Sequence, residues 1–213
     1  MSLCEQLRNG QDAACITPQR KYYQQVVLVN RSDVKNQRIV TSNIDIDGNY
    51  LCRHRVFFDL LPDTAGFRFT SGENGMTIFG LVEKTVVNGI AQYSHSVNII
   101  LVGVEEDTKC LLKQLDGGDY FAALQYYDGT VEIFGFEYGL TTSNYSYDPA
   151  NLSGGAIIKL NSLVDSLEDE PPFVYRTQTP GLETTDFDNN FVGVILDING
   201  DFNDDFNFDF NSD

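Results

Sequence analysis

Alternating and continuous runs of apolar residues, interrupted by three turn dipeptides, dominate the pattern of this chain. The dipeptides are Asp47-Gly48, Asn88-Gly89 and Asp128-Gly129, and each lies between two apolar runs. Asn or Asp followed by Gly accepts the positive φ angles that a two-residue type I′ turn requires at both central positions. The pattern therefore predicts three β-hairpins with type I′ turns, in a chain built mainly of strands.

The hairpin centred on Asn88-Gly89 has unusually long arms. Residues 77–87 precede the turn and residues 90–102 follow it, and both stretches are apolar along much of their length. Strands in globular proteins commonly run to about five or six residues, so these arms are expected to project beyond a compact core. A projecting ribbon needs neighbours that cover its edges. We therefore predict a subunit contact at the tip, formed by Val86, Val87, Asn88 and Gly89.

Further apolar runs predict the rest of a β-rich domain. Strands are expected at residues 26–30, 38–46, 50–60, 66–70, 120–127, 130–136 and 156–160. The stretch 105–115 predicts one α-helix, because acids occupy its first turn and its apolar positions 104, 111, 112 and 115 share one face. The predicted fold class is mainly β, a sandwich or barrel with one flanking α-helix, a long β-hairpin and extended arms at both ends.

Composition changes toward both ends of the 213-residue chain. Residues 1–20 are predicted to form an N-terminal arm, residues 21–163 the β-rich domain, and residues 164–213 an acidic, extended C-terminal arm. Residues 1–164 contain 18 Asp/Glu and 13 Lys/Arg, whereas residues 165–213 contain 13 Asp/Glu and one base, Arg176. Most of the net charge of −17 thus lies in the last quarter of the chain, as is typical of interaction tails.

The acidic charge disfavours one class of function. Binding to a nucleic-acid backbone depends on neutralising its phosphates with Lys and Arg, so specific nucleic-acid binding is not expected, although DNA can pass along a like-charged wall. The longest apolar runs are far shorter than the roughly 20 residues of a membrane-spanning helix. The N-terminal residues do not resemble a secretory signal. We expect a protein that matures in a cytoplasm and has no membrane partner.

The cysteines do not form a recognisable site. Cys4, Cys15, Cys52 and Cys110 are widely scattered, and in a cytoplasm they are expected to stay reduced. A Cys4–Cys15 disulfide and a zinc site that uses Cys52 and His54 are weaker alternatives. No metal site and no cofactor is predicted.

Other candidate chemistry is also weaker than its structural alternatives. Residues 45–49 and 197–201 resemble acidic calcium loops, but their glycine positions differ from those of an EF-hand. A hairpin turn is favoured for the first stretch and a solvated tail for the second. His54 and His95 are expected to face solvent or an interface, because no nucleophile or orienting motif accompanies them. We predict no catalytic residue and no enzymatic activity.

Phenylalanine and acidic residues are interleaved at the C-terminus. Phe202, Phe206, Phe208 and Phe210 all occupy even positions, so they share one face if the segment is extended. Exposed rings are unfavourable in water, and a strand-like run at residues 192–198 precedes them. We expect this tail to dock on a partner by adding a strand to the edge of its sheet, in preference to forming a disordered solubilising tail.

The order of the elements, and the amino-acid sequence of one segment in particular, resemble those of a known family. A helix is followed by Gly117-Gly-Asp-Tyr-Phe-Ala-Ala-Leu-Gln-Tyr-Tyr-Asp-Gly-Thr-Val-Glu-Ile-Phe-Gly-Phe-Glu-Tyr-Gly-Leu140, a loop rich in Tyr, Ser and Asn, and Gly154-Gly-Ala-Ile-Ile-Lys-Leu160. Over residues 20–160 the chain looks like the tail-tube and tail-ring structural proteins of tailed bacteriophages, in particular crAss-like phages of gut Bacteroidetes. The resemblance implies a β-sandwich or barrel with a flanking helix, assembled as rings around a channel. The acidic, Phe-rich C-terminal tail departs from this pattern.

The function that this resemblance implies is structural. The chain would be a virion protein, assembled in the host cytoplasm into rings of a phage tail or neck that line the DNA-ejection channel. Its partners would be copies of itself and neighbouring tail or neck proteins. Arg53, Arg55 and Arg68 would then face protein groups or the exterior. Two other classes stay open: a monomeric β-sandwich module that binds calcium or a carbohydrate, and, with less support, an acid–base hydrolase.

Overall fold

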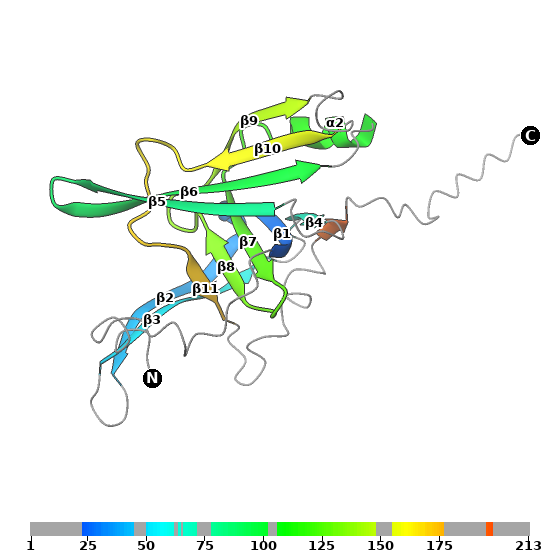
Figure 1. The fold of residues 1–213 in the computed structure, drawn as a ribbon. Coiled ribbons are helices and arrows are strands. Elements are labelled where there is room, and N and C mark those ends of the chain that lie inside the picture. The colour runs from blue at the N-terminus through cyan, green and yellow to red at the C-terminus, as the bar shows by residue number, and fades with distance from the viewer. Residues whose placement is uncertain are drawn as a thin grey trace, which may run out of the picture.

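The computed structural model describes residues 23–44, 50–61, 64, 66–71, 78–101, 106–147, 155–176 and 195–197. Its elements are β1 (Tyr23–Asn30), the 3₁₀ turn η2 (Arg31–Asp33), β2 (Val34–Ile44), β3 (Tyr50–Leu60), β4 (Gly66–Thr70), β5 (Ile78–Val87), β6 (Ile90–Leu101), α2 (Glu106–Gln114), β7 (Tyr120–Tyr126), β8 (Val131–Phe134), β9 (Thr141–Tyr147), β10 (Ala156–Asn161), β11 (Phe173–Tyr175) and β12 (Ile195–Asp197). The prediction of a mainly β fold is confirmed (Figure 1).

The strands form two sheets. One has eight strands in the order β12-β4-β1-β7-β8-β11-β3-β2, and the other has four in the order β5-β6-β10-β9. Neighbouring strands are antiparallel, except that β11 is parallel to β3 and β12 is parallel to β4. Within the described part of the chain, β5 and β9 are therefore the edges of the small sheet, and β12 and β2 are the edges of the large one.

The main core lies between the two sheets. The large sheet contributes side chains such as Leu28 and Leu124, and the small sheet contributes Ile99 and Ile158, all of them fully or almost fully buried. The helix α2 adds Leu111 and Leu112 to the same core, and Leu115, the residue directly after the helix, adds to it as well, as the predicted apolar face indicated. Residues 26–29 are apolar without interruption because β1 is buried on both faces.

The second face of the large sheet closes on itself around an aromatic cluster. The ring centroids of Phe58 on β3 and Phe121 on β7 lie 5.3 Å apart, although β8 and β11 separate these strands in the sheet. Phe136 and Tyr175 pack against Phe58 in the same cluster. Such contacts require a strongly curled sheet, so this half of the domain has a barrel-like curvature.

The predicted domain boundary at residue 163 lies too early in the chain. Residues 173–175, which were assigned to the C-terminal arm, form β11 between β8 and β3. Phe173 is 1% exposed, and its ring packs against Phe136. The acidic residues around β11 hid this short strand, because its burial depends on neighbours far away in the sequence. The described β domain reaches residue 176.

A second strand was also missed by the sequence pattern. Residues 141–147 were interpreted as a polar loop, but they form β9, the edge strand beside β10. The strand is composed of Thr, Ser, Asn and Tyr. Thr and Tyr favour strands without supplying a clear apolar alternation. An edge strand therefore left no periodic signal here.

The turn geometry confirms one predicted turn and corrects another. Asn88 and Gly89 have φ angles of 53° and 82°, as a type I′ turn requires. In the β7–β8 turn Gly129 has a φ of 86°, whereas Asp128 is not in the left-handed region. The Oδ1 atom of Asp128 instead accepts the N–H of Thr130 at 2.9 Å, so the type I′ prediction is wrong for this hairpin. Asp47-Gly48 lies outside the described residues.

The strand-like run at residues 192–198 is described only at 195–197. There β12 pairs with β4, and Leu196 lies opposite Phe67. This pairing is made within a single chain, so the segment adds to its own sheet rather than to a neighbour's. Phe202, Phe206, Phe208 and Phe210 lie outside the described residues.

The close approach of β5 to the large sheet yields a prediction about stability. A Cβ atom at Gly80 would lie 2.6 Å from Cζ of Phe134, a ring that is 2% exposed. We expect Gly80→Ala to lower the free energy of unfolding by about 1–3 kcal/mol, because the buried ring has to move. Thr85→Ala, at an exposed position of the same strand, should change it by less than about 0.5 kcal/mol. Urea unfolding of both variants is the measurement, and equal effects would contradict this account.

Candidate functional site

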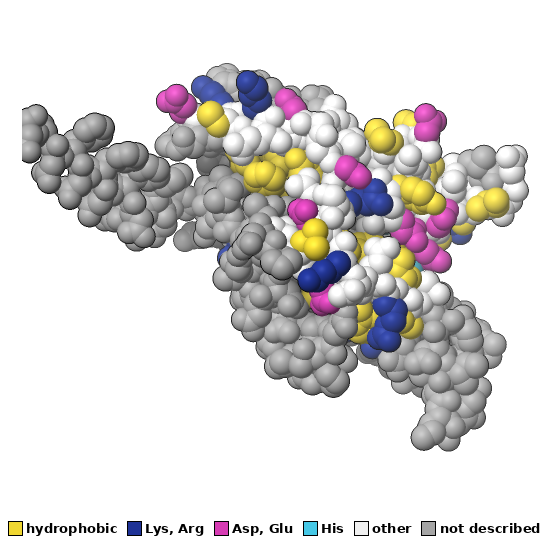
Figure 2. All heavy atoms as spheres, turned by 180° about the vertical axis from the view of Figure 1, so that it is seen from behind, with side chains coloured by type: hydrophobic (Ala, Val, Ile, Leu, Met, Phe, Trp, Pro, Cys, Tyr) yellow, Lys and Arg dark blue, Asp and Glu magenta, His cyan; other side chains and the backbone are white. Residues whose placement is uncertain are grey.

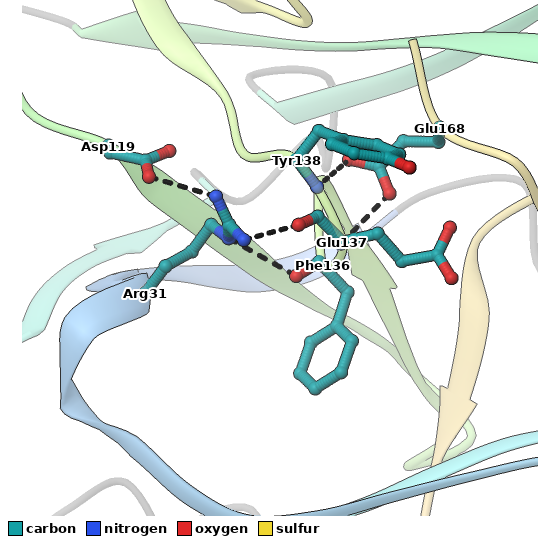
Figure 3. Close-up of polar contacts among 6 residues, drawn as sticks. All are labelled: Arg31, Asp119, Phe136, Glu137, Tyr138 and Glu168. Carbon is teal, nitrogen blue, oxygen red and sulfur yellow. Dashed lines mark hydrogen bonds and ion pairs between the residues drawn. The ribbon is translucent and has the colours of Figure 1, made fainter. Parts of the chain in front are cut away.

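A polar clamp holds the turn between β8 and β9, at residues 135–140 (Figure 3). Gly135 and Gly139 have φ angles of 67° and 89°, so the turn uses two left-handed positions. A Cβ atom at Gly139 would collide with the carboxylate of Asp119 and approach Cδ of Arg31. Only glycine lets these side chains come so close to the backbone of the turn.

The Arg31 side chain binds carbonyl groups of this turn. Its position on η2, directly after the buried strand β1, aims the guanidinium at the turn. The Nε atom donates to the carbonyl of Phe136 at 3.2 Å, and a terminal nitrogen donates to the carbonyl of Glu137. The other terminal nitrogen forms an ion pair with Asp119 at 2.9 Å. The planar fork of donors allows one side chain to satisfy all three acceptors.

The Glu168 side chain binds N–H groups of the same turn. Its carboxylate accepts the N–H of Glu137 at 2.9 Å and the N–H of Tyr138 at 3.0 Å. Successive N–H groups of this kind form a concave site for an anion, and here the chain's own carboxylate fills it. Glu168 is 1% exposed, and this burial raises the pKa of its carboxyl despite the hydrogen bonds, which lower it.

The backbone of Glu168 connects this clamp to the long hairpin. Its N–H and carbonyl pair with the carbonyl and N–H of Tyr93 on β6, at 2.9 and 2.8 Å. One residue therefore ties the β8–β9 turn and the segment after β10 to the outer half of the β5–β6 hairpin, where Tyr93 lies opposite Lys84. Sequence reasoning missed Glu168 and Arg31, because the groups that they bind lie at least 30 residues away along the chain.

His95 is a core residue, and the prediction of a solvent-facing or interface histidine is wrong. The side chain is 1% exposed, and its Nδ1 atom accepts the N–H of Gly135 at 3.0 Å. Ser162 pairs with the backbone of His95 from the other side, because its Oγ accepts the His95 N–H at 3.0 Å. Burial lowers the pKa of His95 to about 4, so the imidazole is neutral at pH 7. The ring fixes β6 to the turn next to Glu168.

A second carboxylate, which is half-buried, lies in the large sheet. The hydroxyl groups of Tyr23 and Tyr126 both donate to Oε2 of Glu132, at 3.1 and 2.9 Å. Burial raises the pKa of Glu132, and it raises that of Tyr126 to about 12. Nearby, Nε of Arg68 donates to Oε1 of Gln25 at 2.7 Å within the same chain.

The surface of the β5–β6 hairpin is the feature most suited to binding another protein. Phe79, Leu81 and Ile90 share the outer face of the small sheet and are 39, 51 and 64% exposed. Val86 at the tip is 61% exposed on the other face. Asn88 and Gly89 are also exposed, whereas for Val87 the structure describes only the backbone, opposite Ile90. Among these residues the prediction missed Phe79, Leu81 and Ile90, although 79 and 81 already alternate in the sequence.

The residues that were weighed as possible metal ligands do not form a metal site within the described residues. Within that part of the chain no three His, Cys, Asp or Glu side chains are grouped as metal ligands. A ring nitrogen of His54 is 2.7 Å from the carbonyl of Pro171, and the ring stacks on Phe173. Cys110 is an exposed free thiol on α2. Residues 45–49, Cys4 and Cys15 lie outside the described residues.

Comparison with known proteins adds no assignment, since no protein family, curated protein or solved structure matches the chain. None of the helices in the described ranges is long and apolar enough to cross a membrane.

The clamp predicts a large difference between two neighbouring acids. Glu168→Ala should lower the free energy of unfolding by about 1–3 kcal/mol, because the N–H groups of Glu137 and Tyr138 lose their acceptor. Asp169→Ala removes an exposed carboxylate and should cost less than about 0.5 kcal/mol. Amide hydrogen exchange should also become faster at Tyr93 in the first variant only. Equal stability of the two variants would refute the clamp.

Glu132 predicts a pH dependence with a definite sign. Its pKa is raised in the folded protein, above the value of about 4.3 for an unfolded chain. The contribution of this group to stability is therefore fully present below about pH 4 and is lost as the pH rises through the folded pKa. Glu132→Gln keeps an acceptor for Tyr23 and Tyr126, so its melting temperature relative to the wild type should increase from pH 4 to pH 8.

The control for this experiment is Glu132→Ala, which leaves the hydroxyls of Tyr23 and Tyr126 without this acceptor. It should be less stable than the wild type throughout the same pH range. If the difference between Glu132→Gln and the wild type does not vary with pH, the Glu132 carboxylate does not titrate as stated.

Proposed function

We propose that this chain is a structural subunit that assembles into rings of a bacteriophage tail or neck and lines the channel through which DNA passes. The observation that carries the proposal is the β5–β6 hairpin. Figure 1 shows it extending well past the body of the domain. Exposed apolar side chains lie along the hairpin (Figure 2), and its strand β5 is an open edge in the described structure.

An open edge with apolar side chains favours association. Unpaired N–H and C=O groups on β5 are a template for another strand, and Phe79, Leu81 and Ile90 add apolar surface beside it. A contact between two different surfaces of identical subunits closes into a ring when the rotation between them allows it. The order of elements in the sequence supports the specific class, a phage tail or neck protein.

The clamp supports this role by positioning the hairpin. Glu168 and His95 fix β6 where the hairpin leaves the domain. A binding element held in one orientation loses less conformational entropy when it associates. Glu168 and His95 would thus hold the proposed contact surface in one orientation.

The net charge of −17 supports a channel for DNA. A wall rich in Lys and Arg would hold DNA through the release of counterions. An acidic or neutral wall lets it slide. The expected partners are further copies of this chain and neighbouring virion proteins.

Substitutions at the hairpin tip test the proposal. Val86→Asp combined with Val87→Asp, and Val86→Asp combined with Ile90→Asp, should abolish ring formation and change the melting temperature little, since Val86 and Ile90 are exposed. Sedimentation velocity at increasing concentration and negative-stain electron microscopy are the measurements. Tyr127→Asp, which adds an acid to the exposed β7–β8 turn, is the control and should assemble like the wild type. A wild-type chain that stays monomeric at high concentration and in the presence of virion partners would overturn the proposal.

A further inference from the structure

Strand β2, an open edge of the large sheet in the described part of the chain, differs from the rest of the chain in its charge. Strands β2 and β3 together contain Lys35, Arg38, Arg53 and Arg55 and a single acid, Asp59, a net of +3. The whole chain has a net charge of −17, so the remainder carries −20. Neither Lys35 nor Arg38 forms an ion pair with a carboxylate that the structure describes. A basic, open edge in an acidic protein attracts an acidic strand.

The two faces of this edge also differ from each other. Arg38 lies opposite Phe57 and Val40 lies opposite Arg55, so these four side chains share one face. The guanidinium of Arg38 lies 4.6 Å from the centre of the Phe57 ring. The other face carries Ile39, which is 38% exposed and lies opposite the buried Val56 of the aromatic cluster. A strand added to β2 would therefore meet positive charge on one face and apolar surface on the other.

Residues 201–213 of this chain have the matching pattern. In an extended strand, successive side chains point to opposite faces. One face of the segment would then carry Phe202, Phe206, Phe208 and Phe210 together with one acid, Asp204, and the opposite face would carry Asp201, Asp205, Asp209 and Asp213. The phenylalanines can continue the apolar face that begins at Ile39, while the aspartates meet Arg38 and Arg55.

We propose that residues 201–213 of one copy add as a strand to the β2 edge of a second copy. This inference rests on the proposed assembly and names one of its contacts, separate from the β5–β6 hairpin. Pairing with β2 satisfies the backbone groups of both strands. The charge pattern supplies the register and the selectivity for this tail.

The position of β12 indicates a second copy rather than the same chain. β12 and β2 are opposite edges of the eight-stranded sheet, with six strands between them. Figure 1 places β12, drawn in orange, on the other side of the domain from the tip of the β2–β3 hairpin. Residues 197 and 201 can be at most about 14 Å apart. Because neighbouring strands are spaced by about 4.8 Å, this distance is too short to cross the six strands that separate β12 from β2 in the same sheet. In a head-to-tail contact the β12 edge of one copy meets the β2 edge of the next, within reach of its tail.

Photocrosslinking in the full chain tests this contact directly. A photoreactive p-benzoylphenylalanine replaces Phe206, and equal amounts of ¹⁵N-labelled and unlabelled protein are mixed before irradiation. Mass spectrometry then shows which residue is linked and whether both copies contribute. We expect links from position 206 to the stretch around Ile39, and half of them should join a labelled to an unlabelled chain.

Charge reversal provides the matched controls. Arg38→Glu with Arg55→Glu should reduce the yield of this link about tenfold, because two attractive contacts become repulsive. Lys113→Glu with Lys159→Glu, at exposed positions on α2 and β10, makes the same change in net charge and should leave the yield unchanged. Lysine at positions 201, 205 and 209 should restore the yield in the first variant. Circular dichroism confirms that each variant is folded.

Several outcomes would overturn the inference. These are links only within one chain, links to other surfaces, links that do not depend on Arg38 and Arg55, or displacement of the tail by duplex DNA bound at this edge. If rings form and the hairpin substitutions abolish them while the tail links elsewhere, the proposed function stands and only this contact is wrong. If the chain never associates, both fail.

Discussion

The contact between the Glu168 carboxylate and the turn at residues 135–140 is the constraint on which the placement of the other elements depends. Together with Arg31, this carboxylate satisfies N–H and C=O groups of the turn between residues 136 and 138. The backbone of Glu168 also pairs with β6. Because the Glu168 side chain is 1% exposed, its carboxylate would be costly to leave without these partners. The result is a junction at the point where the long hairpin leaves the domain.

This junction explains how a domain with such long strands can present a defined contact surface. The part of the hairpin nearest the domain packs on the large sheet, and Gly80 permits the closest approach. The outer part leaves the core and exposes apolar side chains instead. The two sheets thus support a ribbon with exposed apolar side chains, and this arrangement is the physical basis of the proposed role in a ring.

Charge is distributed unevenly between two parts of the molecule, and the charges of these parts are opposite in sign. The acids concentrate in the last quarter of the chain, whereas β2 and β3 carry an excess of bases at an open edge. In a protein whose copies repel each other by net charge, association is favoured only where such local complementarity overcomes the repulsion. The proposed docking of the tail on β2 would use this asymmetry to set the order of neighbouring subunits.

The sequence by itself determined the class of the fold, most of the strands, the helix and the type I′ turn at Asn88-Gly89. These features depend on local periodicity and on φ preferences, which are properties of neighbouring residues. Tertiary structure alone decided the burial of His95, the inclusion of β9 and β11 in the sheets, and the turn at Asp128-Gly129. It also decided the convergence of Arg31 and Glu168 on one turn. These outcomes depend on contacts between residues far apart in the chain, and polar residues that are buried by such contacts have no periodic signature in the sequence.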